Sequence, residues 1–485
     1  MLKMHQTFRL YLIFSVIFSF FRFGLAAQEI TADAGSFGID DKNKIIVWHH
    51  NASDSKATLP KRIKKIRFGT SYKILDKIKS FSYSRSYTIK RRRDTFALYI
   101  TRLPLIIIDV DTALNKDSKV LGTIDYYSSN KSVQSAVGIE FRGNLSLTYP
   151  KKTFDLEFWT DSIAKNPRDI QFMTMRNDDD WILDGLYNEP LRIRSYIASE
   201  LWNAIHKPHY RALAPEAKSG FTQEYVEVFK NKRYLGLFTL SESVDRKQLD
   251  LVKNEDNLIK GELFKAESYE GAPAFEKAPE YNNLFPHWGG FRMEFPVIDY
   301  KSHWEDIADL VNMVVNASDA EFTANIGKRL NMTNVIDYFI FVNVLRATDN
   351  LGKNYYLARY DVAEPYFFVP WDLDGVMGII QDGKRIATTD DILSNGLFDR
   401  LLRLNPNGYR NNLRLRWQTL RKKELGDATL FGQIEHLFSK LKEDKIYERE
   451  HGIWPNQRKL DEDYQYLESW VTKRLLFLDG YFNDL

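Results

Sequence analysis

The stretch that most constrains the fold of this chain covers residues 345–378, LRATDNLGKNYYLARYDVAEPYFFVPWDLDGVMG. Two apolar runs within it, residues 355–360 and 366–370, have the length and the aromatic content of buried strands. Acidic and amide side chains stand where the chain leaves these runs. Because loops at strand ends are where a rigid scaffold presents its functional groups, the stretch predicts a site framed by two strands.

The polar side chains of this stretch suit phosphoryl transfer. Asp349 follows a helical pattern, Asn354 comes five residues later, and Asp372 and Asp374 follow the second run directly. One carboxylate can position a hydroxyl nucleophile, while an asparagine oxygen and a second carboxylate hold Mg²⁺ on nucleotide phosphates. The D-x-x-x-x-N spacing of Asp349 and Asn354 equals that of the kinase catalytic loop H-R-D-x-x-x-x-N, although the histidine is missing. Asp372 stands where the aspartate of the D-F-G motif would stand.

The first 27 residues have the pattern of a secretory signal peptide. Basic residues precede a short apolar run at residues 10–21, and small side chains allow cleavage near Ala26 or Ala27. The run is short for a membrane span, although Arg22 beside it leaves an uncleaved anchor as the alternative. No later stretch is apolar enough to cross a bilayer. We therefore expect an exported protein of the periplasm, cell envelope or extracellular space, with no membrane span after cleavage.

Composition limits the remaining possibilities. The 485 residues allow one large two-lobed domain or two to three domains, and 44% hydrophobic residues are enough for a sizeable core. A net charge of +3 gives no global basic field, so we expect no nucleic-acid partner. The chain has no cysteine, which excludes disulfides, thiolate nucleophiles and cysteine-ligated zinc.

Residues 28–125 are predicted to form a β-rich accessory segment, because short β-branched and aromatic runs alternate with polar turns. Two basic runs lie in it, at residues 61–65 and 90–93. They could dock on an anionic surface or protect a solvated strand edge with charge. The second use is the more common, and we expect it here.

A predicted two-stranded ribbon carries candidate phosphate contacts. Residues 137–142 alternate as a strand and enter an Arg-Gly-Asn turn, and residues 152–158 form the next strand. Arg142, Lys151 and Lys152 could meet phosphates from this ribbon. Neighbouring strand residues point to opposite faces, so only one lysine can serve, and we expect Lys152. The alternative is an ordinary hairpin with exposed lysines.

Helices are predicted on both sides of the stretch at residues 345–378. One should begin with Asn188 as its N-cap and Pro190 in its first turn, and it carries Arg194 and Glu200, which could pair with the ribbon lysine. Residues 397–485 have the amphipathic spacing of further helices.

A second hairpin, at residues 224–229 and 234–240, ends near Glu242. In a two-lobed kinase the connector that recognises adenine occupies this position. Glu242 is therefore a candidate nucleotide contact, and Lys265 is a candidate without a firm role.

Several motifs resemble the CotH (spore-coat protein H-like) kinase family. They are, in order, RGNLSLTYPKK, the predicted helix at residues 187–201, YLGLFTLSESVD, GELFK, TDNLGKNYYL and VPWDLDG. The resemblance covers roughly residues 100–485. It implies an α+β, atypical protein-kinase-like fold of two lobes, behind the β-rich N-terminal segment. It also implies binding of ATP with Mg²⁺ or Mn²⁺ and phosphorylation of serine on secreted or coat proteins.

The resemblance also assigns roles to matching positions. Asp349 matches the catalytic aspartate, and Asn354 and Asp372 match the metal ligands. Asp374 belongs to the same W-D-x-D motif, as a support or as a second metal ligand.

Two departures affect the nucleotide contacts. Arg142 and Lys152 match the R-G-x-S-S and P-K-K blocks, but Leu145 and Ser146 stand where the family usually has two serines. Asn188 replaces an aspartate that is common at the start of the helix motif.

These observations predict a signal peptide at residues 1–27, an accessory domain at 28–125 and a kinase domain at 126–485. We expect a small lobe at about 126–300 and a helical large lobe at about 301–485. The predicted function is transfer of the γ-phosphoryl group of ATP to serine or threonine hydroxyls of envelope or extracellular proteins. The alternatives are a non-catalytic envelope or coat-assembly binding protein on a kinase-like scaffold, and a metal-dependent phosphohydrolase.

Overall fold

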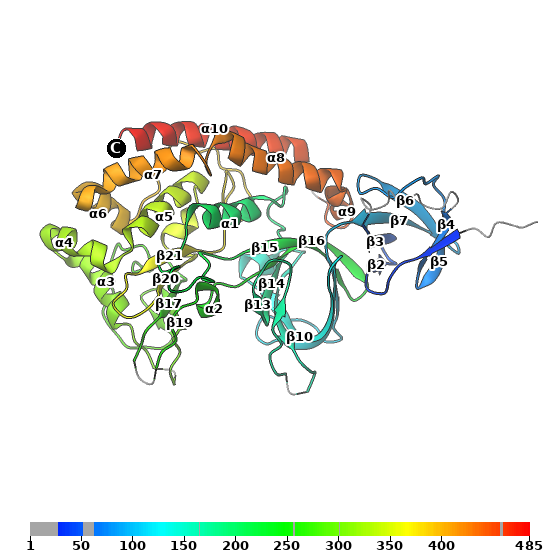
Figure 1. The fold of residues 1–485 in the computed structure, drawn as a ribbon, viewed down its shortest axis with the longest axis horizontal. Coiled ribbons are helices and arrows are strands. Elements are labelled where there is room, and N and C mark those ends of the chain that lie inside the picture. The colour runs from blue at the N-terminus through cyan, green and yellow to red at the C-terminus, as the bar shows by residue number, and fades with distance from the viewer. Residues whose placement is uncertain (1–27, 52–62, 164, 256–257, 300, 456–458) are drawn as a thin grey trace, which may run out of the picture.

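The computed structural model describes residues 28–51, 63–163, 165–255, 258–299, 301–455 and 459–485. The predicted signal peptide lies outside these residues. Figure 1 shows an N-terminal sheet at one end, a barrel in the middle and a helix-rich part at the other end. Within the described ranges, no helix is long and apolar enough to span a membrane.

The N-terminal part is one seven-stranded sheet of order β1-β4-β5-β6-β7-β3-β2. Its strands alternate between buried and exposed residues, so one face makes a core and the other meets solvent. The sheet is curled, so that Phe37 on the edge strand β2 reaches Phe68 on β4, near the opposite edge, with 5.0 Å between ring centroids. The strands are β1 Gln28–Thr31, β2 Phe37–Asp40, β3 Ile45–His49, β4 Ile63–Phe68, β5 Thr70–Ile74, β6 Ser86–Arg91 and β7 Asp94–Thr101.

The middle part is a closed barrel of order β10-β11-β14-β16-β15-β8-β9. Two strands that the sequence analysis placed in the accessory segment, β8 and β9, belong to it. The predicted boundary near residue 125 is therefore wrong, because β8 pairs with β15 in parallel and β9 with β10. The strands are β8 Leu105–Asp109, β9 Val120–Tyr127, β10 Ser132–Arg142, β11 Thr153–Trp159, β14 Asp180–Asp184, β15 Gln223–Lys230 and β16 Arg233–Ser241. Three short elements accompany the barrel: η1 Leu145–Thr148, β12 Ile170–Gln171 and β13 Asn177–Asp178.

The third part places a five-stranded sheet of order β18-β19-β17-β20-β21 among helices. The two strands predicted within residues 345–378 are present as β20 and β21. They pair in one sheet with strands that precede residue 300, so the expected lobe boundary at 300 does not divide the structure. The strands are β17 Glu262–Ala266, β18 His287–Trp288, β19 Phe291–Phe295, β20 Tyr355–Arg359 and β21 Phe367–Pro370.

Helix α5, Met332–Leu345, is buried on nearly all sides and packs against β21 and α7. The predicted C-terminal helices are present, whereas the helix predicted from Asn188 begins only at Arg194, because Arg192 adopts a left-handed conformation (φ 60°). The other helices are α1 Arg194–Ile205, α2 Arg246–Leu249, α3 Glu305–Asn316, α4 Asp319–Arg329, η2 Thr348–Leu351, α6 Gly396–Leu404, η3 Pro406–Gly408, α7 Tyr409–Arg421, α8 Asp427–Glu443, α9 Ile446–His451 and α10 Leu460–Asn483.

Candidate active site

Asp349 lies in the short helix η2, immediately after α5 ends at a left-handed Arg346 (φ 52°). The Asp349 carboxylate is 2.8 Å from Lys353 Nζ and accepts a 3.4 Å hydrogen bond from Asn354 Nδ2. The Tyr269 hydroxyl donates to its other oxygen at 3.4 Å. Three groups thus orient a carboxylate that solvent still reaches.

A glycine lets Tyr269 approach this loop. A Cβ atom at Gly352 would lie 2.1 Å from Cδ1 of the Tyr269 ring, so a larger residue would displace either the ring or the loop. Gly352 therefore has a packing role in this loop.

Asn350 joins the loop that carries Asp349 and Asn354 to the loop that follows β21. Its side-chain amide donates to the Asn354 carbonyl at 2.5 Å and to the Trp371 carbonyl at 2.9 Å. The Trp371 amide donates to the Asn354 carbonyl at 3.0 Å. Asn354 and Asp372 both have positive φ, 57° and 54°, which is uncommon and marks tightly constrained positions. The structure thus brings two predicted metal ligands together at the ends of neighbouring strands.

Three carboxylates, those of Asp184, Asp349 and Asp374, gather around Asp372. Burial raises the pKa of Asp372, and the neighbouring carboxylates of Asp184 and Asp349 raise it further, although solvent reaches the side chain. The pKa of Asp374 is raised well above its ordinary value by burial and then by Asp372 and Asp184. Asn188 Nδ2 donates to Asp374 at 2.9 Å. These crowded oxygens form a site of strong negative potential.

Two cations face this acidic group. Arg142 and Lys265 each lower the pKa of Asp372 and so offset part of the carboxylate repulsion. The Arg142 guanidinium lies 5.8 Å from the centre of the Trp371 ring and 2.5 Å from an oxygen of Asp155. Arg142 is therefore where the sequence placed it, and Lys265, which had no assigned role, joins the site.

The two ribbon lysines point apart, as predicted. Lys152 donates to the Leu147 carbonyl at 2.5 Å and has no ion-pair partner among the residues that the structure describes. Lys151 is completely buried and lies 2.5 Å from a carboxylate oxygen of Glu450 in α9. Burial lowers the pKa of Lys151 to about 8, although Glu450 opposes this shift. A nucleotide contact by Lys152 stays a prediction.

The expected partners of the ribbon lysine are engaged elsewhere. The buried guanidinium of Arg194 pairs with Glu189, and Glu200 is only partly buried on α1. The partner of Lys151 is instead Glu450, which is distant in sequence.

Glu242 lies apart from this site. Its buried carboxylate accepts four hydrogen bonds, which come from the backbone amides of Arg176 and Thr222 and from the side chains of Lys218 and Gln248. These internal donors satisfy both oxygens. The structure therefore gives Glu242 a structural role and does not bring it near the carboxylates of the site.

A second acidic group is less suited to a metal. Asp169, Asp178 and Asp179 have carboxylate oxygens within 4.8 Å of one another. However, Arg176 pairs with Asp178, and Lys247 lies 2.7 Å from Asp178. Cationic side chains already neutralise this group, whereas the group around Asp372 keeps an excess of carboxylates.

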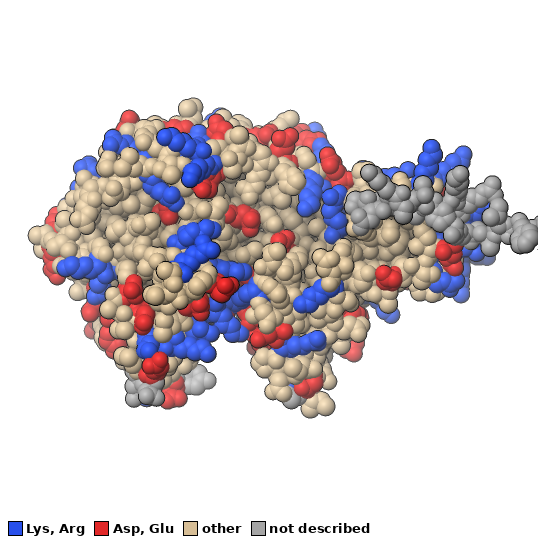
Figure 2. Space-filling model, in the orientation of Figure 1, with Lys and Arg blue, Asp and Glu red and all other residues tan. Residues whose placement is uncertain are grey.

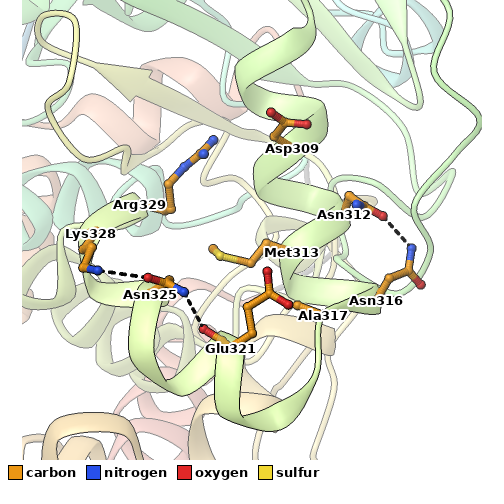
Figure 3. Close-up of a pocket in the computed structure, with 9 residues that line it drawn as sticks. All are labelled: Asp309, Asn312, Met313, Asn316, Ala317, Glu321, Asn325, Lys328 and Arg329. Carbon is orange, nitrogen blue, oxygen red and sulfur yellow. Dashed lines mark hydrogen bonds between the residues drawn. The ribbon is translucent and has the colours of Figure 1, made fainter.

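A large hollow lies elsewhere, between α3 and α4 (Figure 3), with a volume of about 580 Å³. Its polar side chains bond mainly to one another: Asn316 to Asn312, and Lys328 to Asn325. None of the carboxylates described above lines it. We therefore assign it no part in the chemistry.

Sequence reasoning missed Asp184 and assigned no contact to Asn188. Asp184 is the last residue of β14, and its Oδ1 accepts hydrogen bonds from Thr153 Oγ1 at 3.0 Å and from the Leu186 amide at 3.1 Å. The signal was present, because a carboxylate where the chain leaves a buried apolar strand is the pattern that identified Asp372.

The described residues form a mixed helix-and-sheet fold with a carboxylate-rich site, and comparison with known families identifies the class as a kinase-like protein. The model of the family described as CotH kinase protein matches residues 139–478, well over half of the chain. The chain therefore belongs to the CotH kinase protein family. The N-terminal sheet precedes the matched residues.

Comparison with individual proteins adds little. No curated protein matches the chain. Among solved structures, the crystal structure of a Helicobacter pylori proinflammatory kinase, CtkA, matches with 11% sequence identity and a TM-score of 0.20. The match covers 72% of this chain and 100% of that one.

Proposed function

We propose that the protein transfers the γ-phosphoryl group of ATP to serine or threonine hydroxyls of other exported proteins. One observation carries the proposal: Asp184, Asp349, Asp372 and Asp374 converge beside Asn354, with Arg142 and Lys265 facing them. Membership of the CotH kinase protein family supports the same reaction class. Export rests on the predicted signal peptide.

The donor set fits Mg²⁺ or Mn²⁺ with a nucleotide. All the donors are oxygens, which hard divalent cations prefer. Burial, and then the neighbouring carboxylates, raise the pKa values of Asp372 and Asp374, and a bound cation would offset this repulsion. We assign the metal to Asn354, Asp372 and Asp374, with Asp184 beside them. When bound, the metal neutralises charge on the phosphates.

The chain's own residues have separate tasks. Lys353, Asn354 and Tyr269 fix the Asp349 carboxylate, which is free to accept the proton of a substrate hydroxyl. Arg142 and Lys265 are the two cations proposed to bind phosphate oxygens. Because this work is positioning and charge stabilisation, small displacements of the loops should slow transfer strongly.

The test uses the purified full chain with labelled ATP, Mg²⁺ or Mn²⁺, and candidate envelope proteins. Asp349→Asn should bind ATP as the wild type does and should transfer phosphate about 10²–10⁴-fold more slowly, because only the general base is lost. Asp372→Ala should lose metal-dependent ATP binding as well as transfer. Its free energy of unfolding should stay within about 1–2 kcal/mol of the wild type, since a crowded carboxylate is removed from an accessible position.

A matched control is Asp309→Asn, which removes an exposed carboxylate on α3 away from the site. It should leave binding and transfer unchanged. Near wild-type transfer by Asp349→Asn would refute the assignment of the base. Metal-dependent ATP binding without transfer by the wild type to any protein, itself included, would favour the non-catalytic scaffold.

A further inference from the structure

The N-terminal sheet differs in charge from the rest of the molecule. Residues 28–101 contain 16 Lys and Arg against 7 Asp and Glu, whereas residues 102–485 contain 49 against 58. Residues 1–27 add +3, so the net charge of +3 conceals a part at +9 joined to a part at −9. Figure 2 shows Lys and Arg side chains gathered at the N-terminal end of the molecule, with few acidic side chains among them.

Three lysines form a row across this sheet. Lys65 on β4 is paired directly with Lys73 on β5, and Lys73 is paired directly with Lys90 on β6. Directly paired residues of antiparallel strands point to the same face, about 5 Å apart. All three lysines are exposed, and none forms an ion pair within the part of the chain that the structure describes.

The row does not have the role that the sequence analysis expected, which was protection of a strand edge. The edge strands of this sheet are β1 and β2, whereas β5 and β6 are interior strands with neighbours on both sides. Like charges that face each other across strands are unfavourable for folding. The row therefore serves neither edge protection nor stability.

Among the described residues, the outer face is exposed where it carries the lysine row. Closer to the barrel, Val47 and Tyr99 on the same sheet pack with Phe229 and Tyr234 of the barrel. The other face forms the core of the sheet. The free part continues into the exposed Arg92 and Arg93 at the turn after β6.

We propose that the lysine row, Lys65, Lys73 and Lys90, docks the protein on an anionic phospholipid surface. Lysine ammonium groups are point charges without the fork that recognises a single phosphate, so a flat row of them suits a field of headgroups. Leu75, just after β5, is 47% exposed and offers an apolar side chain next to the row.

The position of the row favours lipid over an acidic protein. Strand β1 is the first described strand after the apolar run at residues 10–21. It lies beside β4, where its Glu29 is the backbone pairing partner of Lys65. Until the predicted signal peptide is removed, this sheet is the part of the described structure nearest in sequence to the segment that enters the membrane. The inference is independent of phosphoryl transfer, since the family match begins only at residue 139.

The test is co-sedimentation of the purified full chain with vesicles of phosphatidylcholine, with or without phosphatidylglycerol. The wild type should bind only the anionic vesicles and should be released by high salt. The variant Lys65→Glu/Lys73→Glu/Lys90→Glu should bind them about 100-fold more weakly, because each basic residue near the surface adds to the attraction.

A matched control changes the same charge elsewhere: Lys422→Glu/Lys423→Glu/Lys473→Glu alters three exposed lysines near the C-terminal helices. It leaves the N-terminal sheet unchanged and should bind as the wild type does. Circular dichroism checks that both variants are folded. Equal binding by the two triple variants would overturn the proposal. So would binding of the wild type to polyglutamate but not to anionic vesicles, which would indicate an acidic protein partner.

Discussion

At the residue scale, Glu262 shows how burial can outweigh an ion pair. It lies on β17 directly opposite Arg359 on β20, and the two side chains are 2.7 Å apart. The Tyr366 hydroxyl also donates to Glu262. Burial nevertheless raises the pKa of Glu262 to about 7, because the carboxylate is only 2% exposed and the ion pair and hydrogen bond offset just part of the desolvation.

This raised pKa predicts a pH dependence of stability. Between pH 4.5, the ordinary pKa, and about 7, the folded chain keeps a proton that the unfolded chain has lost. The contribution of Glu262 to the free energy of unfolding should therefore fall by about 3 kcal/mol as the pH rises through this window, and should then level off. Urea unfolding of the wild type and Glu262→Gln at a series of pH values checks it.

The exposed Glu255→Gln provides the control, since its difference from the wild type should change little with pH. A difference between the wild type and Glu262→Gln that stayed constant from pH 4.5 to 7 would contradict the prediction.

At the scale of elements, the site depends on one cross-link between two loops. Asn350 donates to carbonyls of both loops, and each loop carries one candidate metal ligand, Asn354 or Asp372. An amide is required here, because a carboxylate of the same shape has no proton to donate.

We therefore expect Asn350→Asp to be at least as damaging as Asn350→Ala. Each should lower the free energy of unfolding by about 1–3 kcal/mol, since two buried carbonyls lose a donor. Phosphate transfer should fall on the order of 10²-fold, because the loops lose their relative position. Denaturant unfolding and the labelled-ATP assay measure the two effects. The control Asn325→Ala, on the surface of α4, should change neither the stability nor the transfer rate. An Asn350→Asp variant as active as the wild type would show that the site does not depend on the cross-link between the two loops.

At the scale of the whole molecule, the N-terminal sheet is packed firmly against the barrel. Gly38 on β2 lies against the Phe229 ring of β15, and a Cβ atom there would be 2.3 Å from the ring. The helix α9 reinforces the junction, since its Arg449 pairs with Glu227 of the barrel and its Glu448 accepts from Tyr99 of the sheet.

Gly38→Ala should therefore destabilise the molecule by about 1–3 kcal/mol, because the added methyl group overpacks the contact between sheet and barrel. Gly432→Ala is the matched control: it adds the same group on α8, where nothing lies within 4 Å, and it should stabilise by about 0.5–1 kcal/mol. Thermal or urea unfolding compares them. Equal stability of Gly38→Ala and the wild type would mean that the sheet moves freely on the barrel.

The sequence by itself determined the local parts of the site. Asp349, Asn354, Asp372 and Asp374 lie within 26 consecutive residues, and the apolar runs between them dictate strands whose ends meet. Arg142 was also a candidate, because it ends a strand and precedes a glycine turn.

The tertiary structure alone decided the rest, because pairing and burial join residues that are distant in sequence. It brought Asp184 and Lys265 to the site, buried Lys151 against Glu450, and satisfied Glu242 with internal donors. Strand order also decides whether a basic run protects an edge or covers an interior strand, and no local pattern encodes that order. A sequence specifies which groups are available, but their electrostatic environment depends on neighbours that only the folded chain supplies.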